Sequence, residues 1–258
     1  MKLNVDKINI EIVGNGKPTL FIHGVPDSSE VWRNLVNELK DTRRCYMIDL
    51  PGFGNSGIPK DFEFSFDYYS QLIDKIIIRL NIKEQIDLFV HDVGGFYGFS
   101  WAINFPRKVR EIYVFNTAYT SEFKWHFLAK AYQKPLLGEL LTYFLSKKRF
   151  VKLIKKASPL LNYSVAELMF DKLKMSGRKM MMNYYRRTSE SLFEGNDVRL
   201  KRLSKTVRIS VFWGDKDIFI NKNIAETFFA HKVTHYKEYG HWLLVSGYKE
   251  IAKDIYRN

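Results

Sequence analysis

The chain of 258 residues contains a single cysteine, Cys45, so no disulfide can form within it. Cys45 lies in the segment Arg44 to Asp49, which is apolar and has the character of a strand. Free cysteines are among the residues most often buried in proteins. We therefore expect a buried thiol on a strand and no framework of disulfides.

Long apolar runs are absent as well. No stretch approaches the roughly 18 consecutive apolar residues of a membrane-spanning helix, and charges interrupt the apolar residues of Met1 to Lys7. We expect no integral membrane segment and a soluble protein located in the cytoplasm. The sequence also contains no internal repeat, no low-complexity tract and no module that binds nucleic acid. We expect no nucleic-acid partner, and the partner expected from the motifs described below is a small-molecule substrate.

Acidic residues are scarce relative to basic ones. The chain has 41 Lys and Arg against 28 Asp and Glu, and its formal net charge is +13. Much of the excess lies between Thr120 and Arg208, where about twenty basic residues face seven acidic ones. This segment either attracts acidic partners or an anionic membrane surface, or it is the solvated helical face of a protein from a lysine-rich organism.

The residues that are present predict one α/β domain. Hydrophobic residues make up 46% of the chain, enough for a sizeable core. Strand and helix signals alternate in the rhythm of a parallel sheet. Expected strands are Lys7 to Val13, Thr19 to His23, Arg44 to Leu50, Ile86 to His91, Val109 to Phe115, Val207 to Trp213 and Val233 to Tyr239. Helices are expected over Glu30 to Lys40, Asp67 to Leu80, Gly94 to Phe105, Ile220 to Ala230 and the C-terminal residues. Because Gly14 to Gly16 separate the first two strands, we expect these to form an antiparallel hairpin at one edge of the sheet.

The strand signal disappears between Thr117 and about Lys205. In its place, apolar residues follow helical spacing in Leu136 to Phe144, Phe150 to Ala157 and Val165 to Leu173. We therefore expect a helical insertion over residues 118–205, with the α/β core formed by residues 1–117 and 206–258.

The segment Asp87 to Phe96 is an apolar strand that runs into a glycine-rich helix start, with Asp92 at the turn. A sharp strand-to-helix turn holds its nucleophile clear of the sheet, under the positive end of the helix dipole. A carboxylate with an ordinary pKa of about 3.9 is already an anion at neutral pH and needs no base to activate it. Asp92 at this turn therefore suits displacement at a saturated carbon, which leaves an ester that water must cleave.

Other segments supply the parts that such a site requires. The strand before His23 to Pro26 ends in a His-Gly turn, so the backbone N–H groups of Val25 and Val93 could hold an oxyanion. A later strand ends in Gly214 to Asp217, and His241 lies on the loop after the next strand. The resulting chain order is nucleophile, acid, histidine.

Four segments in this order carry a resemblance to a known family: His23 to Arg33, Asp49 to Ser56, His91 to Gly95 and Gly240 to Trp242. The chain resembles the α/β-hydrolase superfamily, in the branch with an Asp nucleophile that holds epoxide hydrolases and haloalkane dehalogenases. The resemblance implies a mostly parallel eight-stranded sheet flanked by helices and a helical cap over the pocket. It implies hydrolysis without a cofactor or a metal.

The resemblance also implies roles for three residues. Asp92 would be the nucleophile, although an Asp before a helix can also be a simple N-cap. His241 would be the general base, oriented by Asp217, which lies three residues after the strand-end glycine; Asp215 would then be a turn residue. Some haloalkane dehalogenases keep their acid at the position of Asn116, which carries no carboxylate here. The remaining histidines, His23, His91, His126, His231 and His235, have an alternative interpretation as turn, packing or surface residues.

The leaving group depends on what stabilises its charge. Haloalkane dehalogenases hold halide between a Trp directly after the nucleophile and either an Asn after the His-Gly turn or a Trp from the cap, and the first two positions are Val93 and Val25 here, so at least half of the halide site is missing. Fluoroacetate dehalogenases bind a carboxylate with arginines at the positions of Val93 and Phe96. Both reactions are therefore disfavoured. Epoxide hydrolases use cap tyrosines, and Met182 to Arg187 is similar to their segment, which would place Tyr185 over the nucleophile. The second donor position holds Leu128, although His126, Tyr132 or Tyr143 could reach in.

We thus predict an epoxide hydrolase-like enzyme that acts through an alkyl-enzyme ester. We expect six residues to line its substrate pocket: His23, Trp32, His126, Leu128, Tyr132 and Trp242. Three alternatives stay open: a haloalkane dehalogenase-like hydrolase, a hydrolase of another activated ester or lactone, and a ligand receptor without catalysis on the same fold.

Overall fold

The computed structural model describes residues 2–257 and contains one eight-stranded sheet in the order β1-β2-β4-β3-β5-β6-β7-β8. Its strands are β1 (Lys2–Val5), β2 (Ile8–Val13), β3 (Lys17–Ile22), β4 (Arg43–Ile48), β5 (Ile86–His91), β6 (Val109–Phe115), β7 (Arg208–Gly214) and β8 (Lys232–Tyr236). The strands from β4 to β8 in this order are parallel, while β2 is antiparallel to both of its neighbours. This confirms the predicted mostly parallel sheet.

The predicted hairpin of the first two strands is wrong. β2 pairs with β4, in the register Ile10 to Ile48, and its hairpin partner is β1, a strand that the sequence pattern did not indicate. β3 instead inserts between β4 and β5. Its last four residues, Thr19 to Ile22, are all buried. A continuously buried run is typical of a central parallel strand, because helices cover both of its faces.

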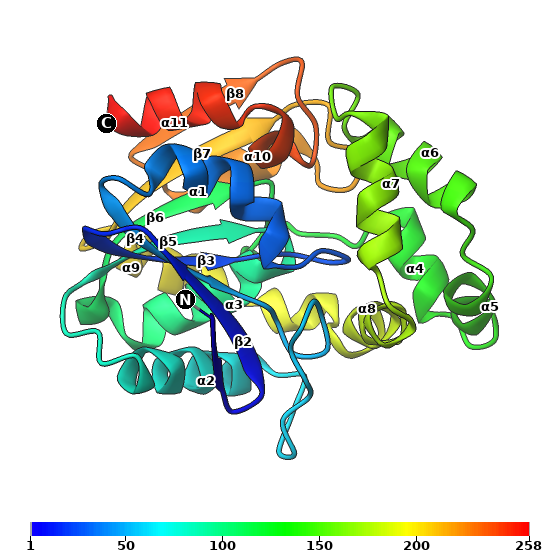
Figure 1. The fold of residues 1–258 in the computed structure, drawn as a ribbon, viewed down its shortest axis with the longest axis horizontal. Helices are drawn as coiled ribbons and strands as arrows, with labels where there is room; N and C mark the ends of the chain where they lie inside the picture. Colours follow the sequence, from blue (N-terminus) through cyan, green and yellow to red (C-terminus); the bar gives the residue numbers. More distant parts are fainter. Residues whose placement is uncertain (1, 258) are drawn as a thin grey trace.

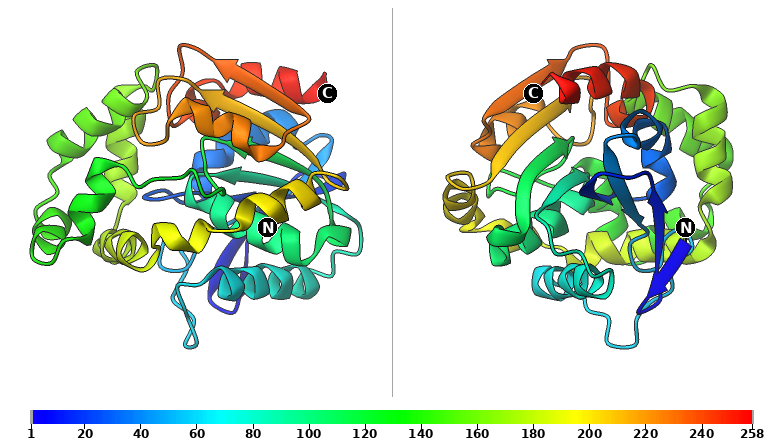
Figure 2. Two further views of the ribbon diagram at one scale, coloured as in Figure 1. Left: turned by 180° about the vertical axis from the view of Figure 1, so that it is seen from behind. Right: turned by 60° about the vertical axis from the view of Figure 1, so that its left-hand side comes forward.

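Helices cover both faces of the sheet (Figures 1 and 2). One face carries α1 (Arg33–Leu39), α10 (Leu243–Ser246) and α11 (Tyr248–Tyr256), and the other carries α2 (Phe66–Arg79), α3 (Val93–Asn104) and α9 (Asn196–Leu203). Short 3-10 helices are η1 (Ser29–Trp32), η2 (Pro106–Lys108), η3 (Glu190–Phe193) and η4 (Lys222–Phe228). The helix expected near Ile220 to Ala230 is therefore a 3-10 segment.

Five helices follow β6 and precede η3 and α9: α4 (Phe127–Gln133), α5 (Leu137–Tyr143), α6 (Lys147–Ala157), α7 (Tyr163–Lys172) and α8 (Met175–Arg187). They lie beyond the carboxyl ends of the parallel strands (Figure 1). No helix within residues 2–257 is both long enough and apolar enough to cross a membrane.

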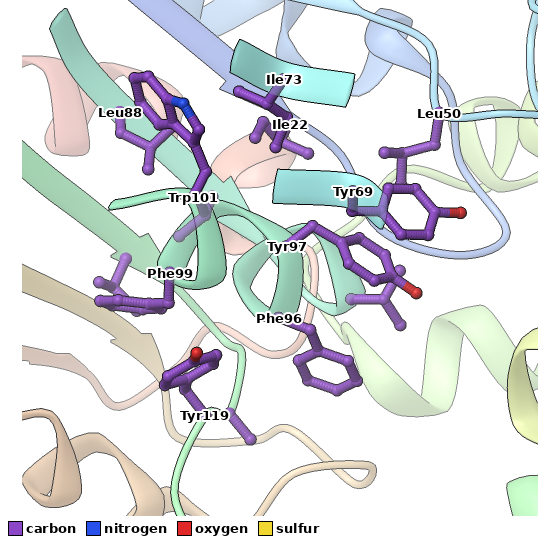
Figure 3. Packing of buried hydrophobic residues seen from close by; sticks show 14 of the residues in the cluster. Ile22, Leu50, Tyr69, Ile73, Leu88, Phe96, Tyr97, Phe99, Trp101 and Tyr119 are labelled. Atoms are coloured by element: carbon purple, nitrogen blue, oxygen red, sulfur yellow. The ribbon is translucent and has the colours of Figure 1, made fainter. Parts of the chain in front are cut away.

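The helix that begins after Asp92 is held on all sides. Ten of the twelve residues of α3 are buried, so it is apolar all round, as expected of a helix inside the core. Figure 3 shows Phe96, Tyr97, Phe99 and Trp101 leaving this helix in different directions. The ring of Tyr97 stacks on that of Tyr69 from α2 with 3.5 Å between centroids. This packing fixes the start of α3, and with it the turn at Asp92. Cys45 is buried on β4, and burial raises the pKa of its thiol to about 12.

Candidate active site

Asp92 lies between β5 and α3 in a strained backbone conformation, with φ 50° and ψ −132°. Non-glycine residues rarely adopt a positive φ, and such strain persists only where neighbouring structure enforces it. Here the backbone N–H of Asp92 donates to the Asn116 carbonyl at 3.2 Å. The Asp92 carbonyl in turn accepts from the Gly95 N–H at 2.9 Å and from the Thr117 hydroxyl. These bonds hold the side chain of Asp92 above the carboxyl end of the sheet.

The His-Gly turn after β3 packs directly against Asp92. A Cβ atom on Gly24 would lie 2.2 Å from the Cβ of Asp92, so only glycine fits at this point. The close approach lets the Val25 N–H donate to Asp92 Oδ1 at 2.8 Å. Val93, the second predicted oxyanion donor, is the first residue of α3 and donates no hydrogen bond to the Asp92 carboxylate in the structure.

His241 connects Asp92 to Asp217. Its Nε2 lies 3.5 Å from Asp92 Oδ2, and its Nδ1 lies 2.7 Å from Asp217 Oδ2. The side chains of His241 and Asp217 are only 2% and 1% exposed, whereas that of Asp92 is 15% exposed. His241 is thus joined to Asp217 by a hydrogen bond and to Asp92 by an ion-pair contact, and Asp92 is the most exposed of the three.

Hydrogen bonds hold the carboxyl group of Asp217 in one orientation. Its Oδ1 accepts from the N–H groups of Phe219 and Ile220 at 2.7 and 3.2 Å, and its Oδ2 accepts from Asn116 Nδ2 at 2.8 Å. Asp215, the competing acid, instead contacts His235 Nδ1 at 2.6 Å, away from His241. Asn116 therefore supports the carboxylate of Asp217 and has no acidic role of its own.

The pKa values of Asp92 and His241 move apart. Burial opposes the charged forms of both groups, yet the Asp217 and Asp92 carboxylates outweigh it and raise the pKa of His241. In the same way, the hydrogen bond and charge of His241 lower the pKa of Asp92 despite its burial. At neutral pH the site therefore holds a carboxylate beside an imidazolium.

Side chains from the insertion form a cluster, here called the roof, in which Tyr185 and His126 lie close enough to Asp92 for its charge to affect their pKa values. Tyr185 from α8 is buried, and its ring packs against Trp125, Tyr132 and His126 with centroid distances of 5.3, 5.5 and 5.8 Å. Burial, together with the negative charge of Asp92, raises the pKa of Tyr185 well above 10. Its hydroxyl makes no hydrogen bond with any residue in the described part of the chain. Tyr185 is thus a neutral donor in the field of Asp92.

His126 is a second free donor at the same roof. It caps α4, because its Nδ1 accepts from the Ala129 N–H at 3.2 Å, and this leaves the proton on Nε2. Burial lowers the pKa of His126 to about 4, against the opposing effect of the Asp92 charge. Within residues 2–257, its Nε2 has no hydrogen-bond partner. Leu128 lies partly buried against the core and offers no polar group.

Two clefts lie at the surface beside this centre. One runs between the turn at Pro26 and Asp27 and an apolar wall from α7 and the residues after it, including Leu168, Met169 and Leu173. The other is lined by His126, Phe219 and Asp217 among others. Neither Asp92 nor His241 lines either cleft, so the clefts reach the neighbours of these two residues.

A comparison with known families agrees with this architecture. Residues 17–248 match the family model of the alpha/beta hydrolase fold, which covers most of the chain. The chain belongs to the α/β-hydrolase fold family. This confirms both the predicted superfamily and the predicted fold.

Curated relatives of this α/β hydrolase match over part of its length. A cis-3-alkyl-4-alkyloxetan-2-one decarboxylase from Shewanella oneidensis is 34% identical over 116 residues, which are 44% of this chain and 36% of that protein. A haloalkane dehalogenase from Agrobacterium fabrum is 32% identical over 102 residues, 40% of this chain and 33% of that protein. The chain thus matches about a third of the length of these relatives.

Solved structures resemble the α/β hydrolase over its whole length. The Cif epoxide hydrolase from Acinetobacter nosocomialis has a TM-score of 0.83 at 16% identity, over 100% of this chain and 87% of that one. A meta-cleavage product hydrolase from Pseudomonas fluorescens has a TM-score of 0.80 at 18% identity, over 100% and 96%. At such low identity the likeness establishes the shared fold.

Three residues predicted to bind substrate are buried and contribute to the packing of the α/β hydrolase. Trp32 is fully buried on the α1 face of the sheet, among Phe21, Phe89 and Phe115. His23 accepts from the Leu50 N–H at 2.9 Å through Nε2 and donates to the Gly24 carbonyl through Nδ1, so it braces the turn. Both side chains are buried, so their contact with substrate stays a prediction, while their packing and bracing roles are seen in the structure.

Trp242 is the third of these residues. Its ring lies behind His241, at 4.7 Å between centroids, within the cluster formed by α6 and α7. Its backbone N–H donates to Ser158 Oγ at 2.8 Å. His91 supports His241 from another side, because its Nε2–H donates to the His241 carbonyl at 3.0 Å. The imidazole of His241 is therefore fixed by packing as well as by Asp217.

Asp27 is a residue of the centre that sequence reasoning missed. Its carboxyl accepts from the indole N–H of Trp242 at 2.7 Å and is only 8% exposed. Burial raises its pKa to about 7, although the Trp242 hydrogen bond and the His241 charge oppose this effect. The available signal was its position two residues after Val25, in the turn that approaches Asp92.

Proposed function

We propose that this α/β hydrolase uses Asp92 as a nucleophile on a carbon of a strained oxygen ring, with an epoxide as the substrate class. The proposal rests on one observation above all. Asp92 Oδ1 accepts a hydrogen bond from the Val25 N–H at 2.8 Å, Oδ2 lies 3.5 Å from His241 Nε2, and the side chain of Asp92 is 15% exposed. A carboxylate that is held in place and still partly exposed is suited to covalent attack. The helical insertion, residues 118–205, would act as the cap.

In the first step a bond forms between an oxygen of Asp92 and the ring carbon, and the ring C–O bond breaks. The departing alkoxide takes a proton from a neutral donor. Tyr185 O–H and His126 Nε2–H are the free donors above Asp92. The product of this step is an ester that carries no charge on Asp92.

Loss of that charge prepares the second step. Asp92 is one of the two carboxylates that keep His241 protonated, so esterification lowers the pKa of His241. The proton that His241 then releases returns to the donor that protonated the alkoxide, and His241 becomes a neutral base. His241 then takes a proton from water, and the resulting hydroxide attacks the ester carbonyl. The Val25 N–H holds the oxyanion that develops on Oδ1, and Val93 is proposed as the second donor. The overall reaction adds one water to the epoxide and gives a diol.

The pocket composition favours an oxygen leaving group over a halide. Val25 and Val93 have no side-chain donor that could bind a departing halide, and Val93 and Phe96 cannot hold the carboxylate of a haloacid. Tyr185 and His126 can instead donate a proton, which an alkoxide needs and a halide does not. We therefore propose epoxides ahead of haloalkanes.

The test is the intact mass of a His241→Gln variant after exposure to a panel of epoxides and a panel of haloalkanes. Since water activation is blocked, an epoxide substrate should remain on Asp92 and add its whole mass. A gain of an alkyl group without the halogen would mean dehalogenation. An inert wild-type protein, with no adduct from either panel, would favour another substrate or a receptor. Asp92→Asn in the same background is the matched control and should gain no mass.

A second candidate substrate is an oxetan-2-one, and the 34% identity to an oxetan-2-one decarboxylase favours it. Attack of Asp92 on the ring carbon that bears oxygen would break the C–O bond and leave a carboxylate, which needs no proton donor. That intermediate can fragment to carbon dioxide and an alkene, and the electron pair returns to Asp92. This route consumes no water, so His241→Gln would keep turnover on the lactone and lose it on the epoxide. Assays of alkene and diol products distinguish the two.

A further inference from the structure

The outer face of α5 carries a stripe of exposed apolar side chains. Here the term α5 stripe denotes Leu136, Leu137, Leu140, Tyr143 and Phe144, which are 79%, 39%, 54%, 52% and 71% exposed. Leu137, Leu140 and Tyr143 are spaced three residues apart along one side of the helix, and Leu136 and Phe144 cap its two ends. Single exposed apolar residues are ordinary, but five on one short helix and its caps gather exposed apolar area in one place.

The inner face of α5 is tightly fixed, so the stripe is not a consequence of loose packing. A Cβ on Gly138 would lie 2.3 Å from the Tyr132 carbonyl oxygen, which shows how closely α5 approaches α4. Thr142 is buried and donates to the Gly138 carbonyl at 2.7 Å. Glu139 binds Arg186 of α8 through both oxygens, at 2.6 and 2.8 Å. The orientation of α5 is thus determined by α4 and α8, and the stripe faces away from both.

Basic residues flank the stripe at both ends. Lys134 precedes α5, Lys148 and Arg149 begin α6, and Lys179 of α8 lies with its Nζ 5.4 Å from the Tyr143 ring. Among the residues that the structure describes, none of these four has an ion pair. The one acid of α5, Glu139, is already neutralised by Arg186. The surface around the stripe is therefore positive.

An apolar stripe with a cationic border matches an anionic lipid bilayer. The apolar side chains can enter the boundary between headgroups and acyl chains, while lysines remain at the level of the phosphates. A second copy of the chain is a poor occupant, because a two-fold contact would bring the same positive borders together. We infer that the α5 stripe is a docking surface for an anionic membrane.

The position of α5 suits such a contact. It lies at the outer end of the insertion, away from the sheet, in the views of Figures 1 and 2. The two helices against which it packs, α4 and α8, carry Tyr132 and Tyr185 of the roof. Docking would thus bring the roof of the centre close to the bilayer. On the proposed function, this points to a substrate that partitions into lipid, although membrane binding itself can be measured without turnover.

The experiment is co-sedimentation of the full chain with sucrose-loaded vesicles of phosphatidylcholine alone, or with 30% phosphatidylglycerol, roughly the charge density of an anionic leaflet. We expect binding to the anionic vesicles that weakens at least tenfold in Leu140→Glu/Phe144→Glu. It should weaken severalfold in Lys148→Glu/Arg149→Glu, and in high salt. The matched control is Ile78→Glu, which places a charge on an exposed apolar site of α2 and should bind as the unchanged chain does.

The stripe residues are exposed, so these variants should keep their fold, and an unchanged melting temperature checks this. Leu140→Ser/Phe144→Ser adds no negative charge and should weaken binding as well. The inference is overturned if the unchanged chain does not sediment with anionic vesicles, or if the stripe variants bind as well as Ile78→Glu. It is also overturned if light scattering finds a dimer that the stripe variants convert to a monomer.

Discussion

At the scale of single residues, the chemistry depends on where one proton resides. Two carboxylates, Asp92 and Asp217, hold a proton on His241 in the resting site, and only Asp217 would still do so once Asp92 is an ester. The same imidazole, His241, is therefore protonated in the resting site and would be neutral, and able to act as a base, once Asp92 is an ester. The change between them follows from the loss of a charge 3.5 Å away.

Asp217→Asn tests this view of His241. Because the variant removes the carboxylate that stays charged throughout, we expect the pKa of His241 to fall and ester hydrolysis to slow by about 10³- to 10⁴-fold. Hydrolysis needs the neutral imidazole, so its rate rises with pH through that pKa. The rise should therefore move to lower pH in the variant. Single-turnover rates of hydrolysis at a series of pH values measure this shift. The same pH profile in the variant and the unchanged chain would contradict the proposed role of Asp217 in raising the pKa of His241.

Asp27 contributes a pH-dependent cost to folding. Its pKa in the folded protein is raised to about 7, so the folded state disfavours the charged form that the unfolded chain carries above pH 4. Stability is therefore lost as pH rises from about 4 to 7. Asp27→Asn keeps an acceptor for the Trp242 indole and removes this cost. We expect a gain on the order of 2–4 kcal/mol at pH 8 and little at pH 4.

Urea unfolding of Asp27→Asn and the unchanged chain at both pH values measures this effect. Asp67→Asn, which alters an acid in the first turn of α2, is the control and should not show the same pH dependence. Equal free energies of unfolding for Asp27→Asn and the unchanged chain at pH 8 would mean that folding does not raise the pKa of Asp27.

At the scale of elements, an ion pair network joins the amino ends of the central strands. Asp87 on β5 is 2% exposed and pairs with Arg43 on β4 and with Arg110 on β6, whose Nε donates at 2.7 Å. Arg43 also donates to the Tyr113 hydroxyl at 3.2 Å. Arg43 lies on β4, Asp87 on β5, and both Arg110 and Tyr113 on β6. The network therefore links three strands side chain to side chain.

Asp87→Ala should cost about 3–5 kcal/mol, because it leaves the buried guanidinium of Arg43 without its anion. Arg110→Ala is the milder comparison, since Arg110 is 35% exposed and its loss leaves Asp87 paired with Arg43. The urea midpoints of the two variants measure the difference. A loss of less than about 1 kcal/mol in the free energy of unfolding of Asp87→Ala would show that the ion pair network contributes little to the stability of the sheet.

At the scale of the whole molecule, the insertion is attached to the core in two different ways. α8 belongs to the main apolar cluster, through Met180, Tyr184 and Tyr185, and Tyr184 shares a hydroxyl hydrogen bond with Tyr69 of α2. α6 and α7 instead form a smaller cluster, with Trp242 as the contact to the core. A helix pair with a small cluster opens at lower free energy than an element of the main core.

Hydrogen exchange followed by mass spectrometry should therefore separate these helices. Backbone amides of α6 and α7 should exchange faster than those of α8, and those of α3 should be the slowest. α3 is the internal reference, because ten of its twelve residues are buried. Equal protection of α6, α7 and α3 would mean that the insertion opens only with the entire molecule.

Much of the fold could be predicted from local patterns. The strand at Ile86–His91, the helix after it and the helical insertion follow from runs of residues close in sequence. The hairpin prediction failed because Gly14 and Gly16 indicate a turn but not which strand β3 will join. At the candidate centre, Asp92, Asp217 and His241 were indicated by motifs, and their roles stay predictions. Asp27 was missed, because nothing in its neighbours announces burial.

The sequence by itself determined the fold family and the chain order of nucleophile, acid and histidine, because strand-end turns with glycine and charged residues are local signals. Only the tertiary structure decided that Trp32 is core, that His126 has an unpaired Nε2–H within reach of the Asp92 charge, and that Asp27 is a buried acid bound to Trp242. Asp27 and Trp242 are 215 residues apart in the chain. Burial and hydrogen bonding of such groups depend on long-range packing, and no local pattern records it.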